Sequence, residues 1–273
     1  MSHQRFSKAQ PNDAHRKHPG APSLWMRLSL MAALLLAITP PVRAAAEPPA
    51  EPFDETEFFV AGSAVGTLVL PAGAPDRRTS AIVILQDGEQ PDGRASRYTD
   101  NLLGAGFAVL EMVYLPGDGL AAVLTALALH PRVAGQPIGL LGFGAGARLA
   151  AEWSGPMGAR ALLSPGCASL APAAMRGEAV LLMHGAADPA NEPGACARLG
   201  ETMGASGGAV RLRTLDGASY AWDLLAISGT DRALLIQPDG SGHVMSRAWP
   251  AMAALSASEV AAFFSTSLLG RRP

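Results

Sequence analysis

Residues 138–150 are Ile-Gly-Leu-Leu-Gly-Phe-Gly-Ala-Gly-Ala-Arg-Leu-Ala, and this stretch decides the fold. Its first five residues are typical of a buried strand, and the small residues after them permit a tight turn into a helix. Two kinds of site use glycine at such a turn. In the nucleophile elbow, G-x-S-x-G, a strained turn lifts its central side chain above the sheet. In the dinucleotide fingerprint, G-x-G-x-x-G/A, a pyrophosphate approaches the N-terminus of the helix.

The segment 142–147 matches the dinucleotide fingerprint literally, and it matches the elbow only with Gly144 in place of serine. Its position in the chain argues against a dinucleotide site. The fingerprint opens its domain, and an acidic residue follows about 20 residues later at the end of the next strand. Here three or four expected strands come first, and the next strand, 159–163, ends in Ser-Pro-Gly without a carboxylate.

Strands and helices alternate on both sides of the turn. We expect strands at 81–86, 107–114, 138–142, 159–163, 180–184 and 210–215, helices at 95–105, 119–130, about 143–153, 195–203 and 256–268, and a leading hairpin of two edge strands at 57–61 and 66–70. Nearly all-apolar strands between helices are typical of a mostly parallel sheet covered on both faces. The sequence therefore predicts one three-layer α/β domain. Residues 224–255 break the alternation and are expected to form a long insertion near the C-terminal edge of the sheet.

An uncharged apolar run at 28–38 lies between Arg27 and a small-residue segment at 42–44, which is the layout of a secretory signal peptide. The run is 11 residues long, whereas a membrane-spanning helix needs about 20, so we expect no stable membrane anchor. We expect a signal peptide at 1–44, a linker at 45–56 and the domain at 57–273. Cleavage after Ala46 and a start at Met26 are alternatives. The protein is then exported, to a periplasm or outside the cell.

Composition excludes several classes of protein. Hydrophobic residues make up 49% of the chain and charged residues 16%, which excludes a disordered chain. The 1–44 leader holds six of the 21 basic and one of the 23 acidic residues, so 15 basic and 22 acidic residues remain. This acidic balance argues against nucleic acid as a partner. Two cysteines exclude a Cys₄ zinc site, and we expect neither a metal nor a cofactor.

Three further stretches carry a resemblance to a known family. They are His-Pro-Arg-Val at 130–133 before the elbow, Leu-Leu-Met-His-Gly-Ala-Ala-Asp-Pro at 181–189, and Leu-Asp-Gly-Ala-Ser-Tyr-Ala-Trp-Asp at 215–223. In order and spacing the chain resembles the dienelactone hydrolase family of α/β-hydrolases, from about residue 66 to 268. The resemblance implies the α/β-hydrolase fold and a carboxylic-ester hydrolase that uses a nucleophile, a histidine and an acid.

The same resemblance implies that two of the three catalytic residues are replaced. The nucleophile, Ser or Cys in the family, falls on Gly144, the histidine falls on Tyr220, and the acid is retained as Asp188. Glycine has no side chain that can attack, and a phenol with a pKa near 10 is a poor proton acceptor at neutral pH. Without a histidine beside it, Asp188 is expected to cap the turn before Pro189.

The resemblance also places an oxyanion hole at this end of the sheet. The backbone N–H of Ala145 and those near Asp87 are its candidates, because such a hole is largely main-chain. Asp87 itself belongs either to this loop or only to a cap of the following turn.

Other polar residues could rebuild a site, and each has a plainer explanation. Ser164 is explained as a turn serine before a proline, and His184 as a histidine that packs or bonds locally. His243 is explained as a solvated loop residue, and Ser219 as a turn cap.

Cys167 and Cys196 lie on neighbouring elements at the C-terminal end of the predicted sheet. An oxidising compartment permits a disulfide between them, and the resemblance favours it, because secreted members of the family can carry cysteines in these loops. Two unrelated buried thiols are the alternative.

Three functions remain open. The first is a non-catalytic, exported member of the family that keeps a small-ligand pocket above Gly144. The second is a carboxylic-ester hydrolase with a rearranged site around Ser164 or His243. The third is a partner-binding protein whose pocket is plugged by Tyr220 and Phe143.

Overall fold

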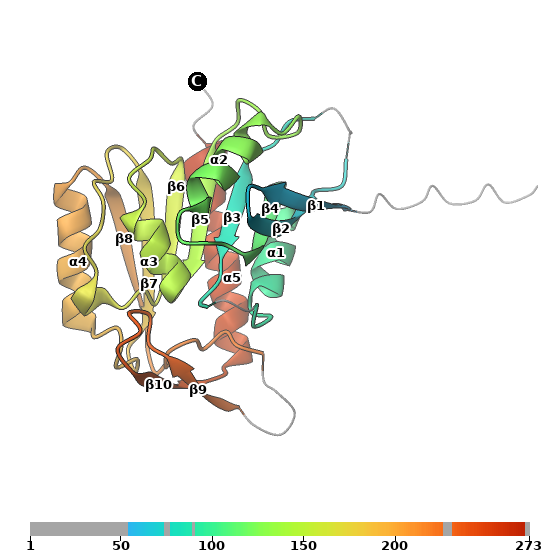
Figure 1. Cartoon of the computed structure of the whole chain (residues 1–273). Helices are drawn as coiled ribbons and strands as arrows, with labels where there is room; N and C mark the ends of the chain where they lie inside the picture. Colours follow the sequence, from blue (N-terminus) through green and yellow to red (C-terminus); the bar gives the residue numbers. More distant parts are fainter. Residues whose placement is uncertain (1–53, 74–76, 89–90, 226–230, 271–273) are drawn as a thin grey trace, which may run out of the picture. The chain divides into compact units, whose positions relative to one another are not determined.

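The computed structural model describes residues 54–73, 77–88, 91–225 and 231–270 (Figure 1). They belong to one compact unit, Glu51–Pro273. The expected signal peptide, with both of its alternative starts, lies outside the described residues, as does most of the expected linker. The first strand begins at Glu55, two residues before the predicted domain boundary, because Glu55 already pairs with Leu70.

The core is an eight-stranded sheet in the order β1-β2-β4-β3-β5-β6-β7-β8. Its strands are β1 (Glu55–Ala61), β2 (Ala64–Leu70), β3 (Ala81–Leu85), β4 (Ala108–Tyr114), β5 (Ile138–Phe143), β6 (Ala159–Leu163), β7 (Ala179–Gly185) and β8 (Ala209–Leu215). All pairs from β4 through β8 are parallel, while β1 and β2 form an antiparallel hairpin. The predicted parallel sheet is confirmed. The prediction that β2 is an edge strand is wrong, because β2 also pairs with β4.

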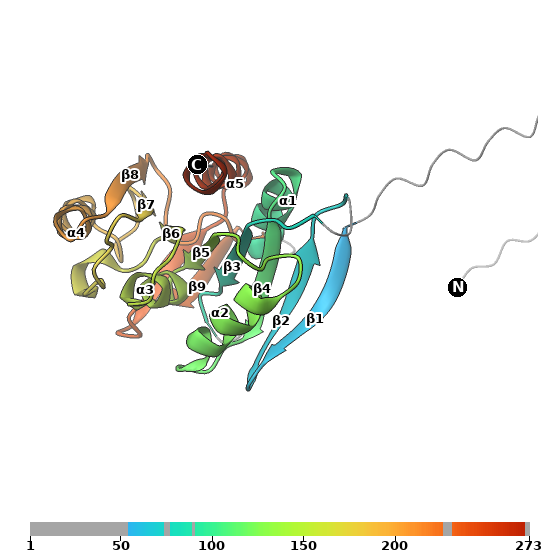
Figure 2. The same cartoon turned by 90° about the horizontal axis from the view of Figure 1, so that it is seen from above.

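Helices cover both faces of the sheet (Figure 2). The first face carries α2 (Gly119–Leu129), α3 (Ala145–Glu152) and α4 (Pro193–Ala205), and the opposite face carries α1 (Ala95–Gly104) and α5 (Pro250–Phe264). Each face has its own buried apolar cluster, and alternate residues of the same strands belong to opposite clusters. Leu162 and Leu182 lie in the first cluster, and Leu163 and Met183 lie in the second. Burial on both faces explains why these strands are continuous apolar runs.

The insertion contains secondary structure that was not predicted. Residues 232–247 form a separate two-stranded hairpin of β9 (Arg232–Ile236) and β10 (His243–Arg247). The last helix begins at Pro250 rather than at 256, because proline suits the first position of a helix. Residues 250–269 are long and apolar enough to cross a membrane. In this fold the apolar character is used for packing, since Val260 and Phe264 are fully buried against the sheet.

A disulfide joins Cys167, in the 3-10 turn Cys167–Ser169, to Cys196 on α4. The predicted pairing is confirmed. It closes a loop with a sequence separation of 29 residues, and the chain-entropy view assigns about 3–4 kcal/mol to a loop of this length. It ties the segment after β6 to the helix after β7, on the side of the sheet where the candidate site lies.

Candidate functional site

The turn between β5 and α3 has the geometry of an elbow. Gly144 is the single residue between the strand and the helix, and its φ of +48° with ψ of −112° is a conformation that L side chains rarely adopt. Gly142 and Gly146 touch neighbouring backbone so closely that a Cβ at either position would overlap main-chain atoms of Ala147 or Leu85. Close backbone packing therefore requires glycine at 142 and 146, and the positive φ favours it at 144.

The space above this turn is filled by two side chains from distant segments. Asp87, just after β3, accepts a hydrogen bond from the Ala145 N–H at 2.8 Å, and Tyr220 donates its hydroxyl to the other Asp87 oxygen at 2.5 Å. A Cβ placed on Gly144 would overlap the Asp87 carboxylate and the Tyr220 hydroxyl oxygen. A nucleophile on residue 144 is thus missing from the sequence and also has no room in the fold.

Asp87 has a role that neither interpretation anticipated, because its carboxylate accepts hydrogen bonds from three donors around the elbow. Its carboxylate occupies the Ala145 N–H, which is one of the two predicted donors of the hole. The Asp87 side chain is only 6% exposed, so this anion is held inside the protein.

Arg94 supplies the balancing charge, and the sequence analysis missed it. Its guanidinium is 3% exposed, lies 3.2 Å from Asp87 and 2.6 Å from Asp92, and approaches Asp223 at 3.7 Å. Burial by itself lowers the pKa of Arg94, but the carboxylates around it raise the pKa overall, so the cation is permanent. Asp87 and Asp92 precede Arg94 in the same connection between β3 and α1, whereas Asp223 comes from a distant segment.

Tyr220 is locked as a hydrogen-bond donor. Burial, followed by the charge of Asp87, raises the pKa of the phenol far above its ordinary value of 10. The insertion holds Tyr220 in place, because Tyr220 forms a β-bridge with Ser246 of β10 and shares a buried cluster with Val244. At neutral pH this phenol cannot accept a proton in the way an imidazole can.

Asp188 caps a turn, as the sequence analysis expected. Its oxygens accept hydrogen bonds from the Ala190 N–H and the Asn191 side-chain amide, both at 2.9 Å. The residue is 2% exposed, and burial raises the pKa of its carboxyl to about 6. Ser164 has a strained φ of +49°, and its buried hydroxyl lies near Asp188 but outside hydrogen-bond geometry.

The side chains of the remaining candidates do not join the contact between Asp87 and the Tyr220 hydroxyl. His184 bonds locally, to the Gly185 carbonyl at 3.1 Å and to Thr214 at 3.0 Å, and burial lowers the pKa of its imidazole. His243 is exposed, at the start of β10 rather than in a loop. Ser219 accepts a hydrogen bond from the Arg247 N–H at 2.8 Å. Among the described residues, none of these three side chains bonds to the carboxylate of Asp87 or Asp188 or to the Tyr220 hydroxyl, and the Ser219 hydroxyl only donates to the Tyr220 carbonyl at 3.4 Å.

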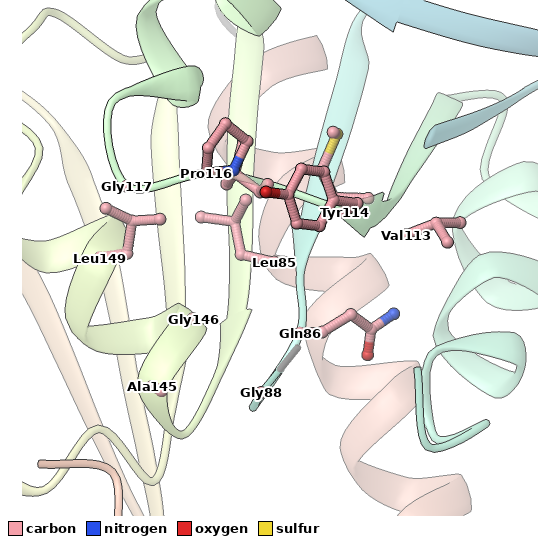
Figure 3. Close-up of a pocket in the computed structure, with 12 residues that line it drawn as sticks. Leu85, Gln86, Gly88, Val113, Tyr114, Pro116, Gly117, Ala145, Gly146 and Leu149 are labelled. Atoms are coloured by element: carbon pink, nitrogen blue, oxygen red, sulfur yellow. The ribbon is translucent and has the colours of Figure 1, made fainter. Parts of the chain in front are cut away.

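A cavity of about 350 Å³ adjoins the elbow on the side of α2 and α3 (Figure 3). Its lining includes Leu85, Gln86, Tyr114, Pro116, Ala145 and Leu149. Phe143 lies elsewhere, packed against Tyr98 on the opposite face of the sheet, so it plugs nothing. The space above Gly144, which Asp87 and Tyr220 fill, and this neighbouring cavity are therefore separate features at the same end of the sheet.

Solved structures with the same architecture are esterases and related hydrolases. Esterase 2 of Thermogutta terrifontis, with propionate bound, is 18% identical, covers 80% of this chain and 96% of its own, and has a TM-score of 0.56. The chain has the α/β-hydrolase fold. Carboxyl esterase 2 of Tuber melanosporum is 12% identical with a TM-score of 0.57, and the match covers 81% of this chain and 89% of that one. Dienelactone hydrolase of Anabaena variabilis is 14% identical with a TM-score of 0.50, covering 80% and 99%.

Other comparisons found no match. No family model matches the sequence, and no curated protein matches it. At these identities the structural similarity supports the fold and leaves the chemistry to the residues of the site itself.

Proposed function

We propose that this protein is an exported, non-catalytic relative of the dienelactone hydrolases, with a small-molecule pocket beside a closed elbow. The observation that carries the proposal is the Asp87 carboxylate, which takes up the Ala145 N–H and the space above Gly144. Each part of ester hydrolysis is affected. Residue 144 offers no attacking atom, Tyr220 offers no base, and the oxyanion donor is already bound to an anion.

An electrostatic effect adds to the missing nucleophile. Ester hydrolysis develops negative charge on the carbonyl oxygen, and a hole accelerates the reaction because its donors are free to meet that charge. A fixed carboxylate bound to the same donor repels the negative charge that develops on the carbonyl oxygen. In the best-studied serine protease, loss of the nucleophile alone reduces turnover by roughly 10⁶-fold. A chain that also lacks the base and the free donor is expected to leave esters intact.

Two observations support export. The segment 28–38 has the layout of a signal-peptide core, and the Cys167–Cys196 disulfide is typical of oxidising compartments. The cavity of about 350 Å³ supports a binding role, because its lining is mainly apolar with one side-chain amide, from Gln86. Its ligand is expected to be small and not anionic, because the Asp87 carboxylate lies next to the lining residue Gln86 in the chain and repels negative charge.

The test is a search for turnover and for a covalent intermediate. The purified protein is incubated with p-nitrophenyl acetate and butyrate, and separately with a fluorophosphonate probe followed by intact-mass measurement. We expect hydrolysis equal to that of heat-denatured protein and no added mass. Turnover that disappears in Asp188→Ala, or a label on Ser164, would instead support the rearranged hydrolase site.

A further inference from the structure

The outer edge of the sheet is an unprotected strand. β1 lies at one end of the strand order, and no other strand of the described residues pairs with its outer side (Figure 2). Phe58 at its centre is 76% exposed and Val60 is 53% exposed. Natural proteins commonly protect such edges with proline, lysine or a bulge. β1 has no proline or lysine, and its pairing with β2 is continuous.

The backbone groups of this strand alternate in direction. Ala61 and Ala64 flank the two-residue turn at 62–63, so they form a hydrogen-bonded pair, and Phe59 and the odd-numbered residues before it also bond toward β2. The three residues between them, Thr56, Phe58 and Val60, therefore direct their N–H and C=O groups to the open edge. Two of these three carry the exposed apolar side chains.

We propose that β1 pairs antiparallel with β1 of a second copy of this chain, around a two-fold axis at Phe58. Phe58 is the middle residue of Glu55–Ala61, so the axis aligns the whole strand with its counterpart. Phe58 then faces Phe58 of the second copy, and Thr56 faces Val60. Each of these pairs exchanges backbone hydrogen bonds, and the two sheets become one continuous sheet.

Charge favours a second copy in this orientation. The acidic residues of β1, Glu55 and Glu57, lie in its first half, so antiparallel pairing places them opposite Ala61 and Phe59 of the other chain rather than opposite each other. Both already have basic neighbours within their own chain. Glu57 lies 3.1 Å from His130, and Glu55 lies 3.7 Å from Arg132. No like charges therefore face each other across the proposed junction.

The first experiment measures the mass of the purified protein by light scattering and sedimentation over a range of concentrations. We expect a twofold mass that falls to that of one chain on dilution. Phe58→Pro is expected to abolish the dimer and keep the fold, because residue 58 donates nothing to β2 and proline is tolerated where an edge N–H faces outward. Thr56→Pro tests the same edge by the same logic. Ile236→Lys is the control, because Ile236 is a similarly exposed apolar residue on β9.

A single new cysteine gives a second, independent measurement. Both native cysteines are bridged to each other, so Phe58→Cys introduces the only thiol. Paired residues across such an axis have Cα atoms about 5.5 Å apart, within the range of a disulfide, so mild oxidation should link two chains. Leu234→Cys on the exposed hairpin should not cross-link. A chain that stays monomeric at every concentration, or a dimer that persists in Phe58→Pro, would overturn the proposal. The first result would indicate instead that β1 pairs with a strand of a different protein.

Discussion

Replacing Asp87 by alanine removes the acceptor shared by Ala145, Tyr220 and Arg94. Tyr220 and Arg94 are buried and Ala145 is half-buried, and a buried donor without a partner costs about 1–3 kcal/mol. Removing one member of a buried ion pair typically costs about 3–5 kcal/mol. Asp92 and Asp223 still neutralise Arg94, so we expect a loss near the lower end, about 3 kcal/mol of unfolding free energy.

The assay is urea unfolding followed by circular dichroism, at neutral pH. Asp92→Ala is the matched control, because Asp92 contacts the same guanidinium but is 28% exposed, and we expect a loss of about 1 kcal/mol or less. Asp87→Asn keeps an acceptor for the Ala145 N–H, so its loss of unfolding free energy should lie between those of Asp87→Ala and Asp92→Ala. Formate should raise the midpoint of Asp87→Ala specifically, because it can refill the anion position and bind only the folded state. If Asp87→Ala is as stable as the unmodified protein and formate has no effect, Asp87 does not organise this site.

Three further predictions test other parts of the structure. Gly144→Ser should lower stability and give no ester hydrolysis, because its Cβ meets Asp87 and Tyr220. Activity above the buffer rate is expected only when Asp87→Gly and Tyr220→His are added, as p-nitrophenyl ester assays will show. The Asp188 carboxyl has a pKa of about 6 in the folded protein and 3.8 in the unfolded chain. Its contribution to the unfolding free energy is therefore fully present below pH 4 and is lost as the pH rises through 6. The loss is about 3 kcal/mol, and Asp188→Asn should flatten that part of the stability–pH curve. Arg160 on β6 forms a buried ion pair with Glu178 and donates to two carbonyls at the end of α3. Arg160→Met should lower the unfolding free energy by about 3–5 kcal/mol, because it leaves Glu178 buried without its ion-pair partner. Adding Glu178→Leu should recover part of that loss in a double-mutant cycle, and equal losses in the single and double variants would contradict it.

Some features that the sequence analysis missed did leave a signal. The hairpin at 232–247 consists of two short runs around Pro-Asp-Gly at 238–240, which is a recognisable turn, yet its exposed apolar residues resemble neither a buried strand nor a polar loop. The early start of α5 at Pro250 also had a signal, because proline is common at the first helical position. Arg94 had none. Its role depends on which carboxylates of its own loop, Asp87 and Asp92, turn toward it and on the approach of Asp223 from a distant segment.

The structure decided the pairing of the two cysteines, which the resemblance only favoured. The sequence by itself determined the mostly parallel sheet, the turn at Gly144 and the absence of a side chain at that position. These follow from local rules, because apolar runs, glycine spacing and residue identity act over a few neighbouring positions. Only the tertiary structure decided that the Asp87 carboxylate fills the space above Gly144. Asp87 meets Ala145 across 58 residues of sequence and Tyr220 across 133, and such contacts exist only after the strands have brought their carboxyl ends together.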